Sequence, residues 1–280
     1  MNKHIATGLL ILGVSLVSAK SEPSVNKDNP SSIITNEKRE NIEKLANQGY
    51  PKAQYLLGLL YLNGISVPKN YEKAIEYLKK SADQNYATAQ ATLGWMYTSG
   101  LGVSKDYKKA FEYYQQAGQN GEAGAWYNIG SLYAAGLGVP NDYGKAFEYY
   151  QKAAAGGYKK ALYQIGSMYL WGKGFPKDYQ KAAEYYQKAA DNGDEEAQYQ
   201  LGSMYEMGLG LQKDYGAAFG YYQKAASAGS AKAQYQLGLM YEFGWGVTQD
   251  NEKAIEYMIK SAGQGDTQAQ DFLQKVSNEQ

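Results

Sequence analysis

The chain has 280 residues, enough for one large domain or two ordinary ones, and 44% of them are hydrophobic. Its 28 basic and 28 acidic residues balance, so net charge gives no basis for binding nucleic acid or an acidic membrane surface. The chain has no cysteine and its single histidine is His4, which excludes disulfides, thiolate metal sites and cysteine nucleophiles. We therefore predict no cofactor and no bound metal.

Residues 1–19 have the pattern of a signal peptide. Lys3 gives a positive start, residues 6–17 form an apolar core too short to span a bilayer, and small residues precede Lys20. We expect cleavage before Lys20 and therefore an exported protein, periplasmic or secreted, without stable membrane insertion. The alternative is a short uncleaved membrane anchor. The next segment, residues 20–35, is polar and contains two prolines, so we predict a flexible linker.

The remaining sequence repeats every 36 residues. The glycine of each "LG" or "IG" pair keeps this step without an insertion, at Gly58, Gly94, Gly130, Gly166, Gly202 and Gly238. A fixed period in this range is typical of stacked repeat arrays. Positions are numbered below by the first repeat, so that position 58 stands for Gly58 and for its equivalents at each later step.

Each repeat predicts a pair of helices. Helix A covers about residues 53–63 and ends at Gly64, a residue type that commonly terminates helices. Helix B covers about residues 71–83 and begins after an Asn or Asp that caps its first N–H groups. These caps are Asn70, Asp106, Asp142, Asp178, Asp214 and Asp250. Apolar residues of helix B lie on one stripe, with lysine and glutamate on the other face.

No hairpin of this kind can bury its own apolar stripe, so neighbouring hairpins are expected to stack. We predict a repeat solenoid over residues 36–280, with six hairpins in its interior. A lone helix at 36–48 resembles helix B and would cap one end. A lone helix at 267–277 resembles helix A and would close the other.

The recurring pattern resembles the Sel-one-like repeat family, a relative of the tetratricopeptide repeat. Residues 197–226 show it well, with the sequence AQYQLGSMYEMGLGLQKDYGAAFGYYQKAA. The resemblance covers about residues 40–275 and implies an all-α fold, a right-handed α/α superhelical solenoid with an adaptor role. Some secreted members of the family carry a disulfide in each repeat and are linked to β-lactam binding or hydrolysis. This chain lacks those cysteines.

Two short motifs resemble catalytic elements without their required context. Ser66 and Lys69 match the S-x-x-K element of penicillin-recognising enzymes, but the accompanying S-D-N and K-T-G motifs are absent. The G-x-G elements of the loops lack the preceding strand of a phosphate-binding loop. We therefore predict that the protein is not an enzyme.

A binding face is predicted on helix A, because positions 56, 59, 62 and 63 vary between copies while the opposite arc hardly varies. In solenoids, helix A usually lines the concave side where partners dock. Position 63 places Trp171, Met207 and Phe243 on this face. The site residues form what we call the predicted ladder: Trp95, Tyr127, Asn128, Tyr163, Gln164, Trp171, Tyr199, Gln200, Tyr235 and Gln236. The competing interpretation is that its tyrosines only pack between neighbouring helices.

An aromatic and amide ladder suits an extended peptide or a polysaccharide, since rings supply contact area and amides bond main-chain or hydroxyl groups. The leading hypothesis is an exported scaffold that binds a protein or peptide on its concave face. The alternatives are a hydrolase or binder acting on a cell-wall or β-lactam substrate, and a glycan-binding module.

The first prediction concerns export. The short apolar core and the small residues before Lys20 predict that the mature chain starts at that lysine. The intact mass of the protein recovered from outside the cytoplasm should equal that of residues 20–280. A mass that includes residues 1–19 would show that the segment is retained as an anchor.

Overall fold

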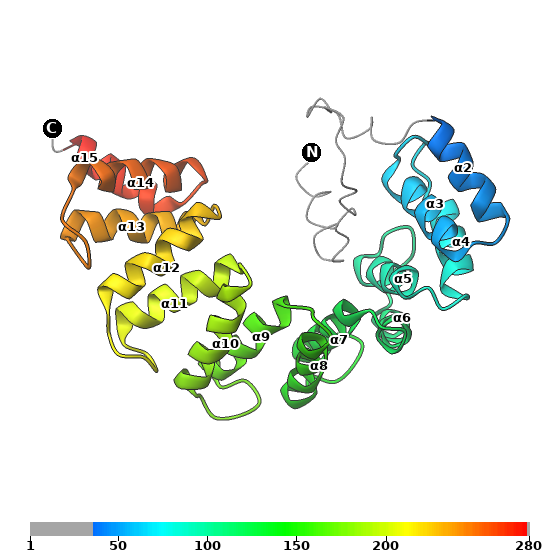
Figure 1. The fold of residues 1–280 in the computed structure, drawn as a ribbon, viewed down its shortest axis with the longest axis horizontal. Coiled ribbons are helices and arrows are strands. Elements are labelled where there is room, and N and C mark those ends of the chain that lie inside the picture. The colour runs from blue at the N-terminus through cyan, green and yellow to red at the C-terminus, as the bar shows by residue number, and fades with distance from the viewer. Residues whose placement is uncertain (1–35, 279–280) are drawn as a thin grey trace. The chain divides into compact units, whose positions relative to one another are not determined.

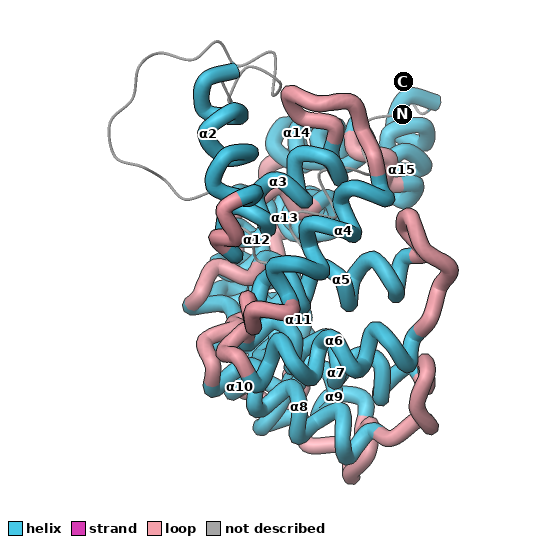
Figure 2. Tube along the Cα trace, turned by 90° about the vertical axis from the view of Figure 1, so that its right-hand side faces the viewer, coloured by secondary structure: helices cyan, strands magenta, loops and turns pink. Residues whose placement is uncertain are grey.

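The computed structural model describes residues 36–278, and this part of the chain consists of α-helices joined by loops (Figures 1 and 2). It contains no strand, so the predicted all-α fold of helix-turn-helix repeats is confirmed. The predicted signal peptide and linker lie outside the described residues. No helix within residues 36–278 is long and apolar enough to cross a membrane.

Six hairpins follow one another along the chain. Their helices are α3 (Pro51–Asn63) and α4 (Tyr71–Ala82), α5 (Ala87–Ser99) and α6 (Tyr107–Gln119), α7 (Ala123–Ala135) and α8 (Tyr143–Ala155), α9 (Lys160–Trp171) and α10 (Tyr179–Asp191), α11 (Glu195–Met207) and α12 (Tyr215–Ser227), and α13 (Ala231–Phe243) and α14 (Asn251–Gly263). Helix α2 (Asn36–Asn47) precedes them and α15 (Thr267–Asn278) follows. The odd-numbered helices α3–α13 are the helices A.

The chain divides into two compact units, one ending at Tyr158 and the other beginning at Lys159. The first unit holds α2–α8 and the second holds α9–α15. Within each unit, every helix packs against the helix before it and the helix after it. Figure 1 shows this order, with the first unit coloured blue to green and the second green to red.

The ends of the helices follow the predicted cap residues. The side chain of Asn70 accepts a hydrogen bond from the backbone N–H of Lys73 at 2.9 Å, and the aspartates at this position do the same in the later repeats. Each helix A ends at a glycine in the left-handed region, as at Gly64 with φ of 69°. These glycines turn the chain into the loop because other residues adopt this conformation only at a cost.

The two helices of each hairpin meet at the glycine of position 58. A Cβ atom added there would lie 2.6–2.8 Å from the side chain at position 78, closer than packed atoms approach. The six pairs are Gly58 with Leu78, Gly94 with Tyr114, Gly130 with Tyr150, Gly166 with Tyr186, Gly202 with Tyr222, and Gly238 with Met258. The glycine therefore sets how close the helices come, and the large side chain fills the space over it.

A second contact joins the helices of each hairpin. The tyrosine at position 61 stacks on the tyrosine at position 77, with ring centroids 5.6–6.0 Å apart and ring planes within 8–16° of parallel. In the first hairpin, Lys73 and Lys80 lie over these two rings at 5.1 and 5.0 Å. This accounts for much of the tyrosine content as framework packing, strengthened by cation–π contact.

Buried glutamines join consecutive hairpins. The side chains of Gln54 and Gln90 each donate to the carbonyl oxygen of an alanine at the end of the preceding helix, at 3.3 and 3.1 Å. Gln198 and Gln234 make the equivalent bonds in the second unit. A buried carbonyl at the end of a helix needs such a partner, so each glutamine fixes the position of one repeat on the next.

The same substitution at two glycines of the second unit should have opposite effects. Gly202→Ala places a methyl group 2.6 Å from the ring of Tyr222, so the free energy of unfolding should fall by about 1–3 kcal/mol. Gly220→Ala adds a methyl group in the interior of α12, where no other side chain or neighbouring helix lies within 4 Å. This substitution should raise the free energy of unfolding by up to about 1 kcal/mol. Urea denaturation followed by circular dichroism measures both. Effects of the same sign would contradict the assignment of Gly202 to the helix contact.

Candidate functional site

The tyrosines of the predicted ladder lie partly inside the fold. Tyr127, Tyr163 and Tyr199 are half-buried and pack against the position 78 tyrosine of their own hairpin, with centroids 5.4–5.6 Å apart. Tyr127 also contacts Tyr158 at 5.0 Å. In the first hairpin, Tyr55 is buried with 5% of its surface exposed. Packing between helices is therefore one role of position 55, and only part of each ring remains on the surface.

Position 59 is also linked to position 78. Ser131 and Ser167 share hydrogen bonds with the hydroxyls of Tyr150 and Tyr186 at 3.2 and 2.9 Å, and Ser203 interacts in the same way with Tyr222. Position 59 therefore contacts the framework in these repeats, although it is one of the variable positions of the predicted binding face. The sequence contains the signal, since serine occurs at position 59 in three of the four hairpins with tyrosine at position 78, and leucine occurs where position 78 is aliphatic. The exception is the second hairpin, which has Trp95 at position 59 and in which the hydroxyl of Tyr114 lies 3.4 Å from that of Thr98.

Burial keeps the position 78 tyrosines neutral. Loss of hydration raises the pKa of Tyr150 to about 12, even though its hydrogen bond to Ser131 favours the ionised form. Burial raises the pKa of Tyr114, Tyr186 and Tyr222 further, and Tyr222 also donates to the carboxylate of Glu206 at 2.7 Å. These hydroxyls act as hydrogen-bonding groups beneath the helix A face, not as acids or bases near neutral pH.

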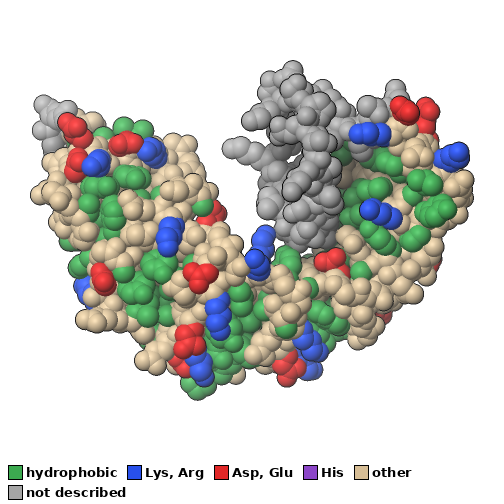
Figure 3. Space-filling view, in the orientation of Figure 1, with side chains coloured by type: hydrophobic (Ala, Val, Ile, Leu, Met, Phe, Trp, Pro, Cys, Tyr) green, Lys and Arg blue, Asp and Glu red, His purple; other side chains and the backbone are tan. Residues whose placement is uncertain are grey.

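Position 63 is the open part of the helix A face. In the second unit, Trp171, Met207 and Phe243 expose 61%, 57% and 56% of their surface in three consecutive repeats. Exposure of apolar surface to water is unfavourable, so large apolar side chains at this level of exposure gain free energy when a partner covers them. Figure 3 shows that exposed hydrophobic side chains on both units lie among scattered charged ones.

Three members of the predicted ladder meet in one pocket of about 300 Å³ in the second unit, called here the Trp171 pocket. Its lining residues are Leu170, Trp171, Lys177, Tyr179, Tyr199, Gln200, Ser203, Met204, Met207 and Leu209. The side chain of Gln200 also forms a hydrogen bond with Tyr163 of the preceding repeat. The walls are aromatic and apolar, and amide, hydroxyl and ammonium groups lie beside them. This combination is typical of sites that bind a side chain and orient it by a few polar contacts.

The Trp171 pocket also contains residues that the sequence interpretation did not include. Tyr179 begins α10 and Leu209 lies in the loop after α11, so neither belongs to a helix A. Both positions are occupied by similar residues in most copies, which indicated framework rather than a site. They were missed because the repeat comparison considered one helix at a time, whereas the pocket forms between one hairpin and the next.

The other members of the predicted ladder are half-buried and lie outside this pocket. In the second unit these are Tyr163, Gln164, Tyr235 and Gln236, and in the first unit they are Trp95, Tyr127 and Asn128. Trp95 packs against the core formed by α3, α4 and α5. Trp171 is therefore the more accessible of the two tryptophans in the ladder.

The S-x-x-K element has no catalytic setting. Ser66 lies in the loop between α3 and α4 with φ of 58°, not at the start of a helix. The ammonium group of Lys69 lies over the ring of Tyr71 at 4.7 Å. Within residues 36–278, no cluster of three or more His, Cys, Asp or Glu side chains could hold a metal ion.

The sequence model of the Sel1 repeat matches six segments of the chain: residues 51–86, 87–122, 125–158, 159–194, 195–230 and 231–266. These segments correspond to the six hairpins. No curated protein matches the chain in sequence.

Solved structures share this architecture. A protective antigen of uropathogenic Escherichia coli strains, which displays an SLR fold, is 35% identical with a TM-score of 0.78 over 85% of this chain and 51% of its own. The chain thus spans about half the length of that antigen. A Sel1 repeat protein from Oxalobacter formigenes is 33% identical with a TM-score of 0.72, over 80% of this chain and 92% of its own.

The buried tyrosines predict a specific loss of stability in alkali. Because the folded-state pKa of Tyr150 is raised from 10.0 to about 12, its contribution to stability is complete below pH 10 and is lost as the pH rises through about 12. The absorbance of the phenolate reports how many tyrosines are ionised at each pH. In urea all tyrosines should ionise near pH 10, whereas in the native protein some should ionise only at higher pH. Superimposable titrations of native and unfolded protein would contradict the burial of these hydroxyls.

Proposed function

The chain belongs to the Sel1 repeat family, and from this premise we propose that it is an exported scaffold that binds a protein or peptide partner on its helix A face. Sel1 repeat proteins generally serve protein–protein interaction and are typically non-enzymatic. The finer elements of the proposal are export, the choice of face and the peptide nature of the ligand. Each has its own support in the sequence and the structure.

The observation that carries the choice of face is the row of exposed apolar side chains at position 63. Trp171 and Met207 come from consecutive repeats and line the same pocket, which joins them into one apolar surface. Binding energy at interfaces concentrates in a few aromatic and apolar residues set in such pockets. Lysine and glutamate of helix B, by contrast, are exposed and solvated, and add little when they pair.

The peptide nature of the ligand is supported by the polar groups beside this surface. Gln200 presents an amide, which can both donate to and accept from a peptide bond. Lys177 adds a positive charge at the wall of the pocket, which favours a carboxylate on the partner. A repeat fold also presents equivalent positions at regular steps, and an extended peptide presents its side chains in the same manner.

Export is supported by the apolar segment and the small residues before Lys20. The relative of 35% identity is a protective antigen, a description that fits a protein accessible from outside the cell. We accordingly place the protein in the periplasm or outside the cell.

The proposed scaffold is not an enzyme: the chain after residue 19 has neither the histidine nor the cysteine that metal and triad chemistry require. Turnover of nitrocefin by the pure protein, abolished by Ser66→Ala, would establish the hydrolase alternative instead. Saturable binding on a glycan array without any captured protein would establish the glycan-binding alternative.

The fourth prediction tests the face. A partner is first captured by crosslinking and pull-down from the envelope of the native organism. Trp171→Ala should then weaken its binding by about 2 kcal/mol or more, since exposed aromatic anchors dominate such interfaces. Met207→Ala should weaken binding less, because a smaller and more flexible side chain is removed. Surface plasmon resonance measures both affinities.

The control is the pair Lys109→Ala and Glu112→Ala on helix B, which removes exposed charges from the opposite helix of a hairpin. All variants should keep the circular dichroism spectrum of the parent, because each altered side chain is exposed. The urea midpoint should also be kept, except for a small fall in the helix B pair, since Lys109 lies over the ring of Tyr97 at 5.5 Å. Binding that survives Trp171→Ala but is lost in the helix B pair would place the partner on helix B.

A further inference from the structure

One hairpin departs from the others at position 75 of helix B. The residues at this position are Ile75, Phe111, Phe147, Ala183, Phe219 and Ile255. The fourth hairpin thus carries a methyl group where every other hairpin carries a large apolar side chain. The departure is a loss of side-chain volume at one place in an otherwise regular array.

The structure shows what the large side chain does in other repeats. The ring of Phe111 meets the ring of Tyr133 edge to face, with centroids 5.9 Å apart and planes at 85°. Phe219 meets Tyr241 in the same way, at 5.4 Å and 84°. In both cases the tyrosine is at position 61 of the next helix A. The phenyl ring therefore fills the junction between one hairpin and the next.

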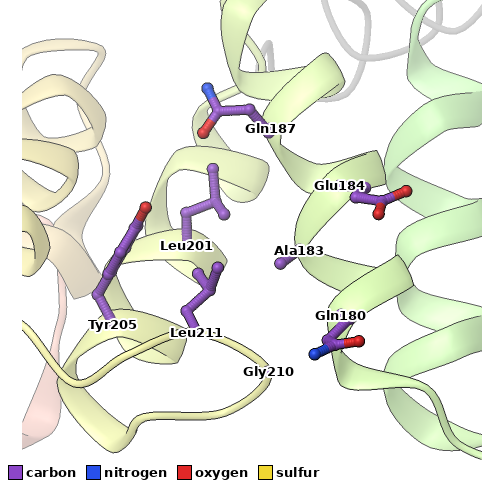
Figure 4. A pocket seen from close by; sticks show the side chains of 8 residues that line it. All are labelled: Gln180, Ala183, Glu184, Gln187, Leu201, Tyr205, Gly210 and Leu211. Carbon is purple, nitrogen blue, oxygen red and sulfur yellow. The ribbon is translucent and has the colours of Figure 1, made fainter.

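At Ala183 this junction holds an open pocket of about 400 Å³, called here the Ala183 pocket (Figure 4). Its lining residues are Gln180, Ala183, Glu184, Gln187, Leu201, Tyr205, Gly210 and Leu211. Tyr205 is the position 61 residue of the next helix A, the partner that a phenylalanine at 183 would contact. In Figure 4 the side chains of Leu201 and Leu211 lie between Tyr205 and Ala183.

The apolar residues around Ala183 are larger than their counterparts in most other repeats by only one methylene group, which does not replace a phenyl ring. Leu211 stands where most other repeats have valine, which adds one methylene group. Gly210 cannot contribute, because a Cβ there would lie 2.4 Å from the backbone of Tyr179. The Ala183 pocket is open to solvent, and Ala183 and Leu201, which are 4% and 1% exposed, form its floor. Its volume exceeds the roughly 150 Å³ of a closed apolar cavity that holds benzene, so a phenyl ring can lie in it with one edge in water.

We propose that the Ala183 pocket binds the aromatic side chain of a ligand, in the place that Phe219 occupies one hairpin later. Leu211 is partly exposed and supplies apolar contact over the buried Leu201, and Tyr205 offers the ring face that meets an aromatic edge in the equivalent junctions. This occupant follows from the molecule itself, since two other junctions of the same chain hold a phenyl ring against the same tyrosine.

The rim defines the rest of the ligand. Gln180 is exposed and presents an amide, while Glu184 carries the only charge among the lining residues. Its carboxylate disfavours a free carboxylate close to the ring. The ligand chemistry that fits is therefore an aromatic residue within a peptide, whose carboxyl group is an amide, rather than a free amino acid.

The Ala183 pocket is independent of the proposed function. It lies between α10 and the loop after α11, and shares no lining residue with the Trp171 pocket. A ligand could therefore bind here whether or not the helix A face binds a partner, and the two sites can be tested separately.

The experiment titrates the full mature chain with N-acetyl-L-phenylalaninamide and follows methyl and aromatic resonances by NMR. Saturable shifts of Leu201, Leu211 and Tyr205 in the millimolar range are expected, because a single side chain makes few contacts. N-acetyl-L-leucinamide and N-acetylglycinamide should produce much weaker shifts. Equal shifts with the leucine compound, or none with the phenylalanine compound, would overturn the proposal.

Ala183→Phe fills the pocket from within and should reduce the affinity at least about tenfold, since ligand and side chain compete for one space. Because the other junctions accept this residue, the variant should also have a higher urea midpoint than the parent. Ala183→Ile provides a second filler, copied from the first and last hairpins, in case the larger ring is not accommodated.

Ala135→Phe is the matched control, since it adds the same ring at an exposed position in the first unit. It should leave the titration of Leu201 and Tyr205 unchanged, and Trp171→Ala should do the same. Shifts that persist in both Ala183 variants would show that the phenylalanine compound binds elsewhere, and would overturn the assignment.

Discussion

The contact between the glycine at position 58 and the side chain at position 78 is the constraint on which the hairpins depend. A hydrogen atom on helix A allows helix B to approach until a methyl group would not fit, as at Gly202 and Tyr222. That approach brings the tyrosines of positions 61 and 77 into stacking distance and aligns the buried glutamines with the preceding helix. Because each hairpin repeats the contact, the 36-residue period of the sequence corresponds to one hairpin of the structure.

The same contact determines what the helix A face can offer a ligand. A tyrosine at position 78 lies across the glycine, and its hydroxyl reaches the level of positions 59 and 62, where Ser167 or Glu206 bonds it. The central part of the face is thereby committed to holding the framework. The side chains at position 63 lie at the edge of this face and do not bond the tyrosine at position 78. Trp171 and Met207 can therefore remain exposed without loss of packing elsewhere.

The fold followed from the sequence because it depends on local rules that repeat. Cap residues such as Asn70, stop residues such as Gly64 and a fixed period specify helices, turns and stacking without knowledge of distant contacts. The site followed only in part. Position 55 looked accessible from its helical arc, yet Tyr199 packs on Tyr222, because burial depends on the side chain that the other helix supplies. The Ala183 pocket could not be predicted from helical periodicity, which describes one helix at a time. It depends on the contact between position 75 of one hairpin and the tyrosine at position 61 of the next.

Both candidate sites occur at the junction of the fourth and fifth hairpins, and this follows from the way a repeat fold distributes stability. Each hairpin keeps its own glycine contact and tyrosine stack, with Gly166 and Tyr186 in one and Gly202 and Tyr222 in the next. Residues outside those contacts, such as Ala183 and Trp171, can therefore change without unfolding their neighbours. In the second unit, the exposed Trp171 and the small Ala183 both occur at positions where the residue differs from those of the other repeats, and each contributes to a pocket that also includes residues common to most copies.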